Sequence, residues 1–98
     1  MPVKKIHVVD DSPTERHALH ELLTKNGYQV TTAESGEEGI EKAKTELPDL
    51  ILMDVVMPGL NGYQATRTLT RDEATKSIPI IVCTSKGQET DKIWGLRQ

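Results

Sequence analysis

The sequence predicts an α/β fold with a parallel sheet, and two observations support that prediction. Short runs of β-branched and aliphatic residues alternate along the 98-residue chain with segments whose apolar residues recur at helical spacing. A helix-start signal, S-x-x-E, follows two of these runs, at Ser12 and at Ser35. Alternating strands and helices favour parallel strands joined by right-handed crossovers.

The first strand–helix unit covers residues 4–27. Residues 4–9 are predicted to form a strand, and Ser12 is predicted to cap a helix that starts at Pro13. Gly27 suits the left-handed position that often ends a helix. The apolar stripe expected to face the core consists of Ala18, Leu19, Leu22 and Leu23.

Three further strands and three further helices complete the alternation. The apolar run that ends in Asp54 suits a parallel strand covered on both faces. Gly59 and Gly62, in the loop after Asp54, are expected to allow a positive φ or a close approach of two chain segments. The predicted strands are residues 28–33, 49–54 and 78–84, and the predicted helices run from Ser35 to about Thr45, from about Tyr63 to Thr70, and from near Glu89 onward.

Composition excludes several classes of protein. The net charge is −3, and without a basic cluster the chain is not expected to bind nucleic acid. No apolar run reaches the roughly 18 residues that membrane insertion needs. Cys83 is the single cysteine, which excludes an internal disulfide and favours a cytoplasmic location. We expect Cys83 to be a small core residue.

Four polar side chains should meet at the carboxyl edge of the sheet, where α/β proteins bind ligands. Asp10 and Asp11 follow the first strand, while Asp54 and Thr84 end two others. Crowded carboxylates repel each other unless one holds a proton or a divalent cation binds. An oxygen-only ligand set favours Mg²⁺, which indicates phosphoryl chemistry.

The arrangement suggests a role for each of these side chains. Asp54 could be a nucleophile that forms an aspartyl phosphate. Asp11 would be the principal metal ligand with Asp10 in support, and Thr84 could donate a hydrogen bond to a phosphoryl oxygen. The simpler alternative is a solvated acidic turn. His17 and His20 could bind metal, but with no third ligand they are expected to be surface histidines.

The segments "VVDDS", "LILMDVVMPGLNG" and "IPIIVCTS" resemble the receiver domains of two-component response regulators. More narrowly, "DDSPTE", "MPGLNGYQATR" and "SKGQETDKIWGLRQ" resemble the single-domain twitching-motility regulators of the PilH type. The resemblance implies a doubly wound, flavodoxin-like sheet of strand order 2-1-3-4-5. It also implies that Asp54 accepts a phosphoryl group from a histidine kinase and that Thr84 is the switch hydroxyl. Mg²⁺ would be held by Asp10, Asp11, Asp54 and the backbone carbonyl of Val56.

The sequence departs from the family at its end. Receiver domains carry a lysine after a fifth strand and then a fifth helix, whereas Lys86 lies in the wrong loop for that role. Residues 1–98 are therefore expected to form a receiver domain that lacks its last strand and helix. Strand 78–84 would be an exposed edge, which predicts low stability or pairing with another chain, and hence a monomer or a weak or swapped dimer.

Two other functions compete with a switch that signals to a downstream protein target. A receiver without the lysine could be a binding module that works without phosphorylation. An aspartyl-phosphate hydrolase commonly needs a second acid two residues after the nucleophile, and that position holds Val56. The protein is therefore expected not to be an enzyme with turnover. Trp94 could be a core anchor or a partner contact.

Overall fold

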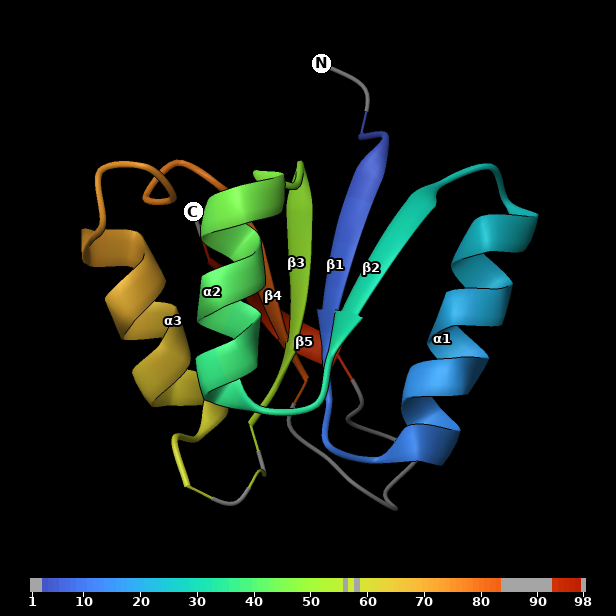
Figure 1. Ribbon diagram of the computed structural model, residues 1–98, viewed down its shortest axis with the longest axis horizontal. Coiled ribbons are helices and arrows are strands. Elements are labelled where there is room, and N and C mark those ends of the chain that lie inside the picture. The colour runs from blue at the N-terminus through green and yellow to red at the C-terminus, as the bar shows by residue number, and fades with distance from the viewer. Residues whose placement is uncertain (1–2, 56, 58, 84–92, 98) are drawn as a thin grey trace.

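The computed structural model describes residues 3–55, 57, 59–83 and the backbone of 93–97. They form a five-stranded sheet of order β2-β1-β3-β4-β5 (Figure 1). The first four strands are mutually parallel, which confirms the predicted order 2-1-3-4. The strands are β1 Lys5–Val9, β2 Gln29–Ala33, β3 Leu50–Asp54, β4 Ile80–Cys83 and β5 Ile93–Arg97.

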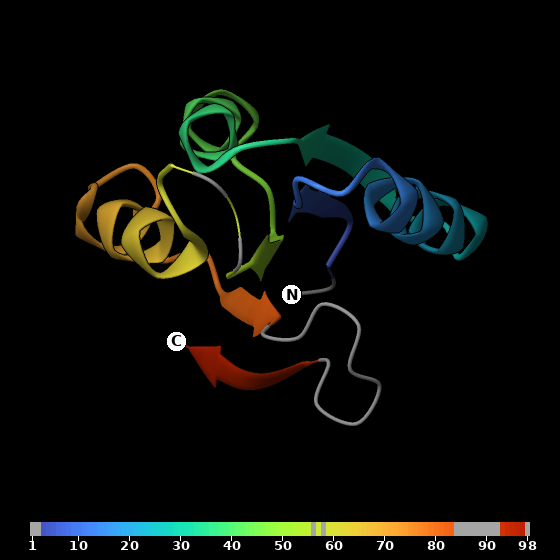
Figure 2. The ribbon, with the colours of Figure 1, turned by 90° about the horizontal axis from the view of Figure 1, so that it is seen from below.

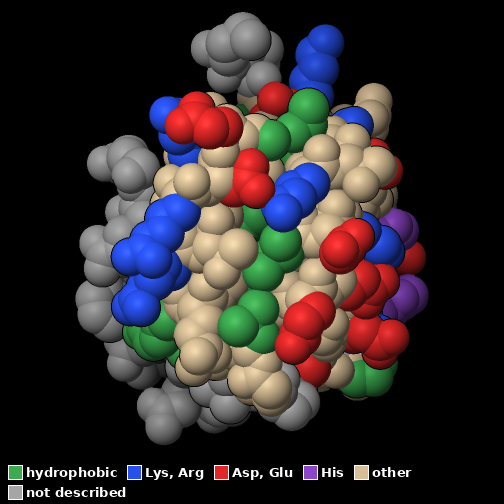
Figure 3. Space-filling view, turned by 60° about the vertical axis from the view of Figure 1, so that its left-hand side comes forward, with side chains coloured by type: hydrophobic (Ala, Val, Ile, Leu, Met, Phe, Trp, Pro, Cys, Tyr) green, Lys and Arg blue, Asp and Glu red, His purple; other side chains and the backbone are tan. Residues whose placement is uncertain are grey.

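Helices cover both faces of this sheet. α1 (Pro13–Lys25) lies on one face, whereas α2 (Gly36–Glu46) and α3 (Gly62–Arg71) lie on the other (Figure 2). The side of the molecule that carries α2 and α3 shows Lys and Arg gathered at mid-left and Asp and Glu mainly at lower right, with further groups of both charges towards the top and a band of small hydrophobic groups between them (Figure 3). Within the described residues, every helix falls short of the length and apolar character of a membrane span.

The helix starts follow the capping chemistry of the sequence. The hydroxyl oxygens of Ser12 and Ser35 each accept a hydrogen bond from the backbone N–H three residues later. A third cap, at Asn61, was not predicted. Its side chain accepts from the Gln64 backbone N–H, and the Gln64 side chain accepts from the Asn61 N–H, both at 3.0 Å. This reciprocal pair fixes the start of α3 shortly after Asp54.

The end of the chain corrects the sequence prediction. Ile93–Arg97, expected to belong to a fourth helix, form β5 and pair antiparallel with β4. β4 is therefore not an edge strand, and a fifth strand is present, although the family resemblance implied a parallel one. Pairing satisfies backbone groups that an edge would leave exposed. Ile and Trp favour strands and Gly95 weakens a helix, which explains the error.

Side chains along the strands alternate between two hydrophobic clusters, as pleated strands require. In β1, Val8 faces α1 and Val9 faces α2 and α3. The predicted stripe on α1 is only partly correct: Leu19 and Leu23 pack against the sheet, whereas Ala18 and Leu22 are exposed. The cluster beneath α2 and α3 contains Val9, Ala33, Ala43, Ile51, Met53, Met57, Ala65, Leu69, Ile80 and Val82.

Candidate metal and phosphoryl site

Three carboxylates meet at the carboxyl edge of the sheet. Asp54 ends β3, while Asp10 and Asp11 directly follow the neighbouring strand β1. One oxygen of each side chain lies within 4.8 Å of the others, the one cluster of three or more possible metal ligands in the described part of the chain. Because Val9 pairs in register with Met53, the carboxyl ends of β1 and β3 lie side by side. The structure thus brings together the three aspartates that the sequence analysis selected.

The burial and chemistry of this cluster fit a divalent cation. Asp10 is 5% exposed and Asp54 is 4% exposed, while Asp11 is half-buried. Three negative charges so close together repel each other strongly where water is scarce. The donor set consists of carboxylate oxygens alone, which Mg²⁺ prefers over nitrogen or sulfur. These three residues could therefore hold Mg²⁺, with water in its remaining positions.

Backbone contacts with the neighbouring loop and strand fix Asp54. The N–H of Val55 donates to the carbonyl of Cys83 at 3.1 Å, and the N–H of Gly62 donates to the carbonyl of Val55 at 3.1 Å. A Cβ atom on Gly62 would overlap the Asp54 carbonyl oxygen and lie 2.7 Å from Val55 Cα. Gly62 therefore allows a close approach and Gly59 has φ +74°, which confirms both expected backbone roles.

Asp10 is fixed on three sides. Its N–H donates to the Ala33 carbonyl in β2 at 3.0 Å, and its Oδ1 accepts from the Ser12 N–H at 2.9 Å. Its carbonyl oxygen accepts from Nη1 of Arg16, on α1, at 2.8 Å. Sequence reasoning missed Arg16. Arg16 lies six residues after Asp10 in the sequence, and its contact with Asp10 cannot be recognised until the orientation of the first turn of α1 is known.

Cys83 lies beside the cluster rather than deep in the core, and it is only half-buried. Its register partner across β3 and β4 is Asp54. Burial, followed by the charges of Asp54 and Asp10, raises the pKa of the Cys83 thiol to about 11. The thiol therefore stays protonated near neutral pH, so it is a poor nucleophile and a poor metal ligand there.

Several predictions concern residues outside the described part of the chain. They include the metal-binding carbonyl of Val56, the switch hydroxyl of Thr84 and the exclusion of Lys86 from the lysine role. The side chain of Trp94 lies outside it as well. The three aspartates are therefore the part of the predicted site that the structure describes.

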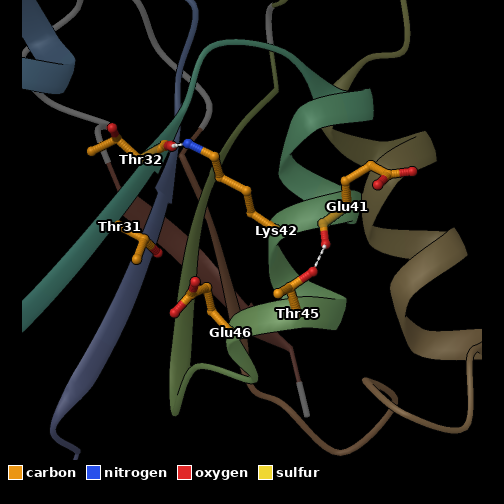
Figure 4. A pocket seen from close by; sticks show the side chains of 6 residues that line it. All are labelled: Thr31, Thr32, Glu41, Lys42, Thr45 and Glu46. Atoms are coloured by element: carbon orange, nitrogen blue, oxygen red, sulfur yellow. Dashed lines mark hydrogen bonds between the residues drawn. The ribbon is translucent and has the colours of Figure 1, made fainter.

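Two other hollows are lined by none of the three aspartates, although Arg16 lines the second. A polar groove of about 360 Å³ separates α2 from β2, and the ammonium of Lys42 crosses it to donate to the Thr32 carbonyl at 2.7 Å (Figure 4). A smaller cleft of about 240 Å³ runs beside α1, lined in part by exposed His17 and half-buried His20. Among the described residues, these histidines belong to no cluster of three possible metal ligands.

Comparisons with known proteins identify relatives of the chain. A sequence model of the response regulator receiver domain matches residues 6–98. The chain is 57% identical over 94 residues to protein PilH of Pseudomonas aeruginosa, covering 96% of this chain and 78% of PilH. It is 43% identical to the alkaline phosphatase synthesis transcriptional regulatory protein PhoP of Bacillus subtilis, covering 95% of this chain but 38% of PhoP.

Solved structures share the same fold. Chemotaxis protein CheY4 of Vibrio cholerae superimposes with a TM-score of 0.81 and 31% identity, over 90% of this chain and 73% of that one. The receiver domain of the sensor histidine kinase PA1611 from Pseudomonas aeruginosa has a TM-score of 0.81 and 32% identity, over 92% and 74% of the two chains. In that structure a magnesium ion is coordinated in the active site cleft.

Proposed function

Because the chain belongs to the response regulator receiver domain family, we propose that it is a phosphorylation-dependent switch in two-component signalling. Asp54 accepts a phosphoryl group from a histidine kinase. Asp10 and Asp11, together with Asp54, hold the Mg²⁺ ion that the transfer needs. The domain assists its own phosphorylation and dephosphorylation, but it is a signalling module rather than an enzyme with turnover.

One observation carries this proposal: one oxygen from each of the three aspartates lies within 4.8 Å of the others. Such crowding of charge at a largely buried edge disfavours a purely structural role, because repulsion has to be relieved by a proton or a cation. Asp54 is the best-placed nucleophile since it ends a central strand and precedes the loop that leads to Gly62.

The transfer is a nucleophilic displacement on phosphorus. A carboxylate oxygen of Asp54 attacks the phosphorus of the donor, and the bond from phosphorus to the donor's histidine nitrogen breaks. The electron pair of that bond stays on the histidine nitrogen, and Asp54 becomes an aspartyl phosphate. Bound Mg²⁺ would supply charge neutralisation on the transferring group. The family resemblance adds the Val56 carbonyl as a metal ligand.

The output passes through protein contacts. On the family pattern, phosphorylated Asp54 draws the Thr84 hydroxyl inward and changes the surface that a downstream protein reads. The 57% identity to PilH supports a role in the cytoplasm within type IV pilus, twitching or chemotaxis-like control. We extend the proposal to that setting on likeness alone.

A small phosphodonor tests the proposal. The chain is incubated with acetyl phosphate and Mg²⁺, and intact mass is followed with time. Stable addition of one phosphoryl group, lost in Asp54→Asn and retained in the control Asp72→Asn, supports the switch. Rapid release of inorganic phosphate with continued turnover would indicate a hydrolase. Absence of modification and turnover would favour a binding module that works without phosphorylation.

A further inference from the structure

We infer that Arg16 is a positioning residue, which fixes the peptide group between Asp10 and Asp11 and thereby sets the affinity of the carboxylate cluster for Mg²⁺. The inference rests on the proposed function, since it concerns the same metal site. Arg16 does not belong to the cluster itself, because its contact is with a backbone carbonyl.

The guanidinium of Arg16 reaches from α1 back to the end of β1. Nη1 donates to the Asp10 carbonyl oxygen at 2.8 Å, and the side chain is half-buried. The backbone N–H of Arg16 donates to the Ser12 carbonyl at 2.9 Å in the first helical turn. The same residue therefore belongs to the start of α1 and holds the loop that precedes it.

The Asp10 carbonyl and the Asp11 nitrogen belong to one planar peptide unit. Holding that carbonyl therefore also fixes the direction in which Asp11 leaves the loop. Two other hydrogen bonds of Asp10, to the Ala33 carbonyl and from the Ser12 N–H, act on its nitrogen and its carboxylate, whereas the bond from Arg16 acts on its carbonyl oxygen. Arg16 restrains this peptide group with a charge-assisted hydrogen bond, which is stronger than a neutral one.

Electrostatics alone predicts the opposite effect of losing Arg16. A positive guanidinium close to the cluster repels a cation, so its removal should strengthen Mg²⁺ binding. Loss of positioning should weaken Mg²⁺ binding, because residues that orient metal ligands typically contribute tenfold or more to affinity. The sign of the change in affinity therefore separates the two roles.

The test compares Mg²⁺ affinity by calorimetry in the wild-type chain, Arg16→Met, Arg16→Lys and the matched control Arg67→Met, which lies on exposed α3 surface. We expect Arg16→Met to weaken binding about tenfold. Arg16→Lys, which keeps the charge and one donor, should recover part of the loss, and Arg67→Met should match the wild type. Unchanged or tighter binding in Arg16→Met would overturn the inference.

A second readout separates this inference from global stability and from the proposed function. All variants are measured at a temperature where circular dichroism shows them folded. Without metal, Arg16→Met should shift the backbone NMR signals of Asp11 and Ser12 and leave β3 unchanged. If the wild type binds no Mg²⁺, the proposed function fails. Whether or not Mg²⁺ binds, unchanged Asp11 and Ser12 signals in metal-free Arg16→Met would refute the positioning role.

Discussion

The two faces of the sheet differ in how completely helices cover them. Among the described residues, ten buried hydrophobic side chains form the cluster beneath α2 and α3, whereas three form the cluster beneath α1. α1 itself has no buried residue, and Leu22 on its surface is 55% exposed. α3, in contrast, buries Leu69 completely.

This difference extends to the site at the edge of the sheet, because α3 contacts Asp54 and α1 contacts Asp10. Asp54 is fixed by close packing, with Gly62 at the start of α3 lying against its carbonyl. Asp10 accepts a hydrogen bond at its carbonyl oxygen from Arg16 on the loosely packed α1. Asp54 and Asp10 are almost equally buried, so the comparison teaches that a close backbone contact from α3 restrains the proposed phosphoacceptor, whereas a hydrogen bond from α1 restrains the proposed metal ligand Asp10.

The largest expected effect comes from matched truncations on the two faces. Leu69→Ala should lower the free energy of unfolding by about 2–5 kcal/mol, because it opens a cavity in a dense core. Leu22→Ala should change it by less than about 0.5 kcal/mol, since the side chain is largely exposed. Urea unfolding measures both. Equal losses in the two variants would contradict the contrast between the faces.

The next effect concerns the glycine beside Asp54. Gly62→Ala should destabilise the protein by about 2–3 kcal/mol, because the new Cβ overlaps the Asp54 backbone. A Cβ atom on Gly27, at the end of α1, would have open space around it. Only the φ of +93° opposes Gly27→Ala, which should lower the free energy of unfolding by about 1 kcal/mol. Thermal unfolding compares the two variants. A tolerated Gly62→Ala would show that α3 is held less tightly than described.

Removal of the helix caps should give a smaller difference in the free energy of unfolding, again with the larger loss for α3 than for α1. Asn61→Ala should lower the free energy of unfolding by about 1.5 kcal/mol, because it removes the side-chain acceptor of the reciprocal hydrogen bonds between Asn61 and Gln64. Ser12→Ala should cost about 0.5–1 kcal/mol, since its one cap bond, to the Glu15 N–H, is longer at 3.3 Å. Chemical denaturation gives both values, and a larger loss for Ser12 would reverse the ranking.

The smallest effect is a pH dependence at His7, which faces α2. Nε2 of His7 lies 3.1 Å from the Gly39 carbonyl and Nδ1 lies 2.7 Å from the Thr31 hydroxyl. Burial lowers the pKa of His7 below its ordinary value of 6.5, outweighing these hydrogen bonds; nearby Lys42 lowers it further and Glu38 opposes this. The unfolded chain therefore takes up the proton first, and stability should fall as pH drops below about 6.5 towards the lowered folded pKa.

This dependence can be isolated by comparing unfolding curves of the wild type and His7→Gln at a series of pH values. The variant should lose less stability than the wild type over the window just below pH 6.5, where carboxylates have hardly begun to protonate. Surface His17→Gln is the control and should retain the wild-type slope. Parallel curves for His7→Gln and the wild type would refute the assignment.

Much of the fold could be predicted because local signals agree with the global pattern. Ser12 and Ser35 signal helix starts, and the apolar run to Asp54 signals a buried strand. The end of the chain could not be predicted in this way. Whether Ile93–Arg97 forms a helix or a strand depends on the free edge of β4, and a tertiary pairing overrides local preference there.

From the sequence, only those residues of the site that lie at the ends of strands could be predicted. The carboxyl ends of β1 and β3 bring Asp10, Asp11 and Asp54 together, so sequence position was sufficient. Arg16 could not be found, since its role depends on how α1 is rotated about its axis. The same rotation leaves Leu22 exposed, because α1 contacts the sheet along a narrower stripe than its apolar residues suggest.

The most direct test of the account is a Mg²⁺ titration of stability in the wild type and in Asp11→Asn. If the three aspartates hold the ion only in the folded state, a hundredfold excess of Mg²⁺ over its Kd should raise the free energy of unfolding by about 2.7 kcal/mol. Asp11→Asn should lose that gain, while its metal-free form should be at least as stable because repulsion is eased. A wild-type unfolding curve that Mg²⁺ does not shift, or a full gain retained in Asp11→Asn, would contradict the account.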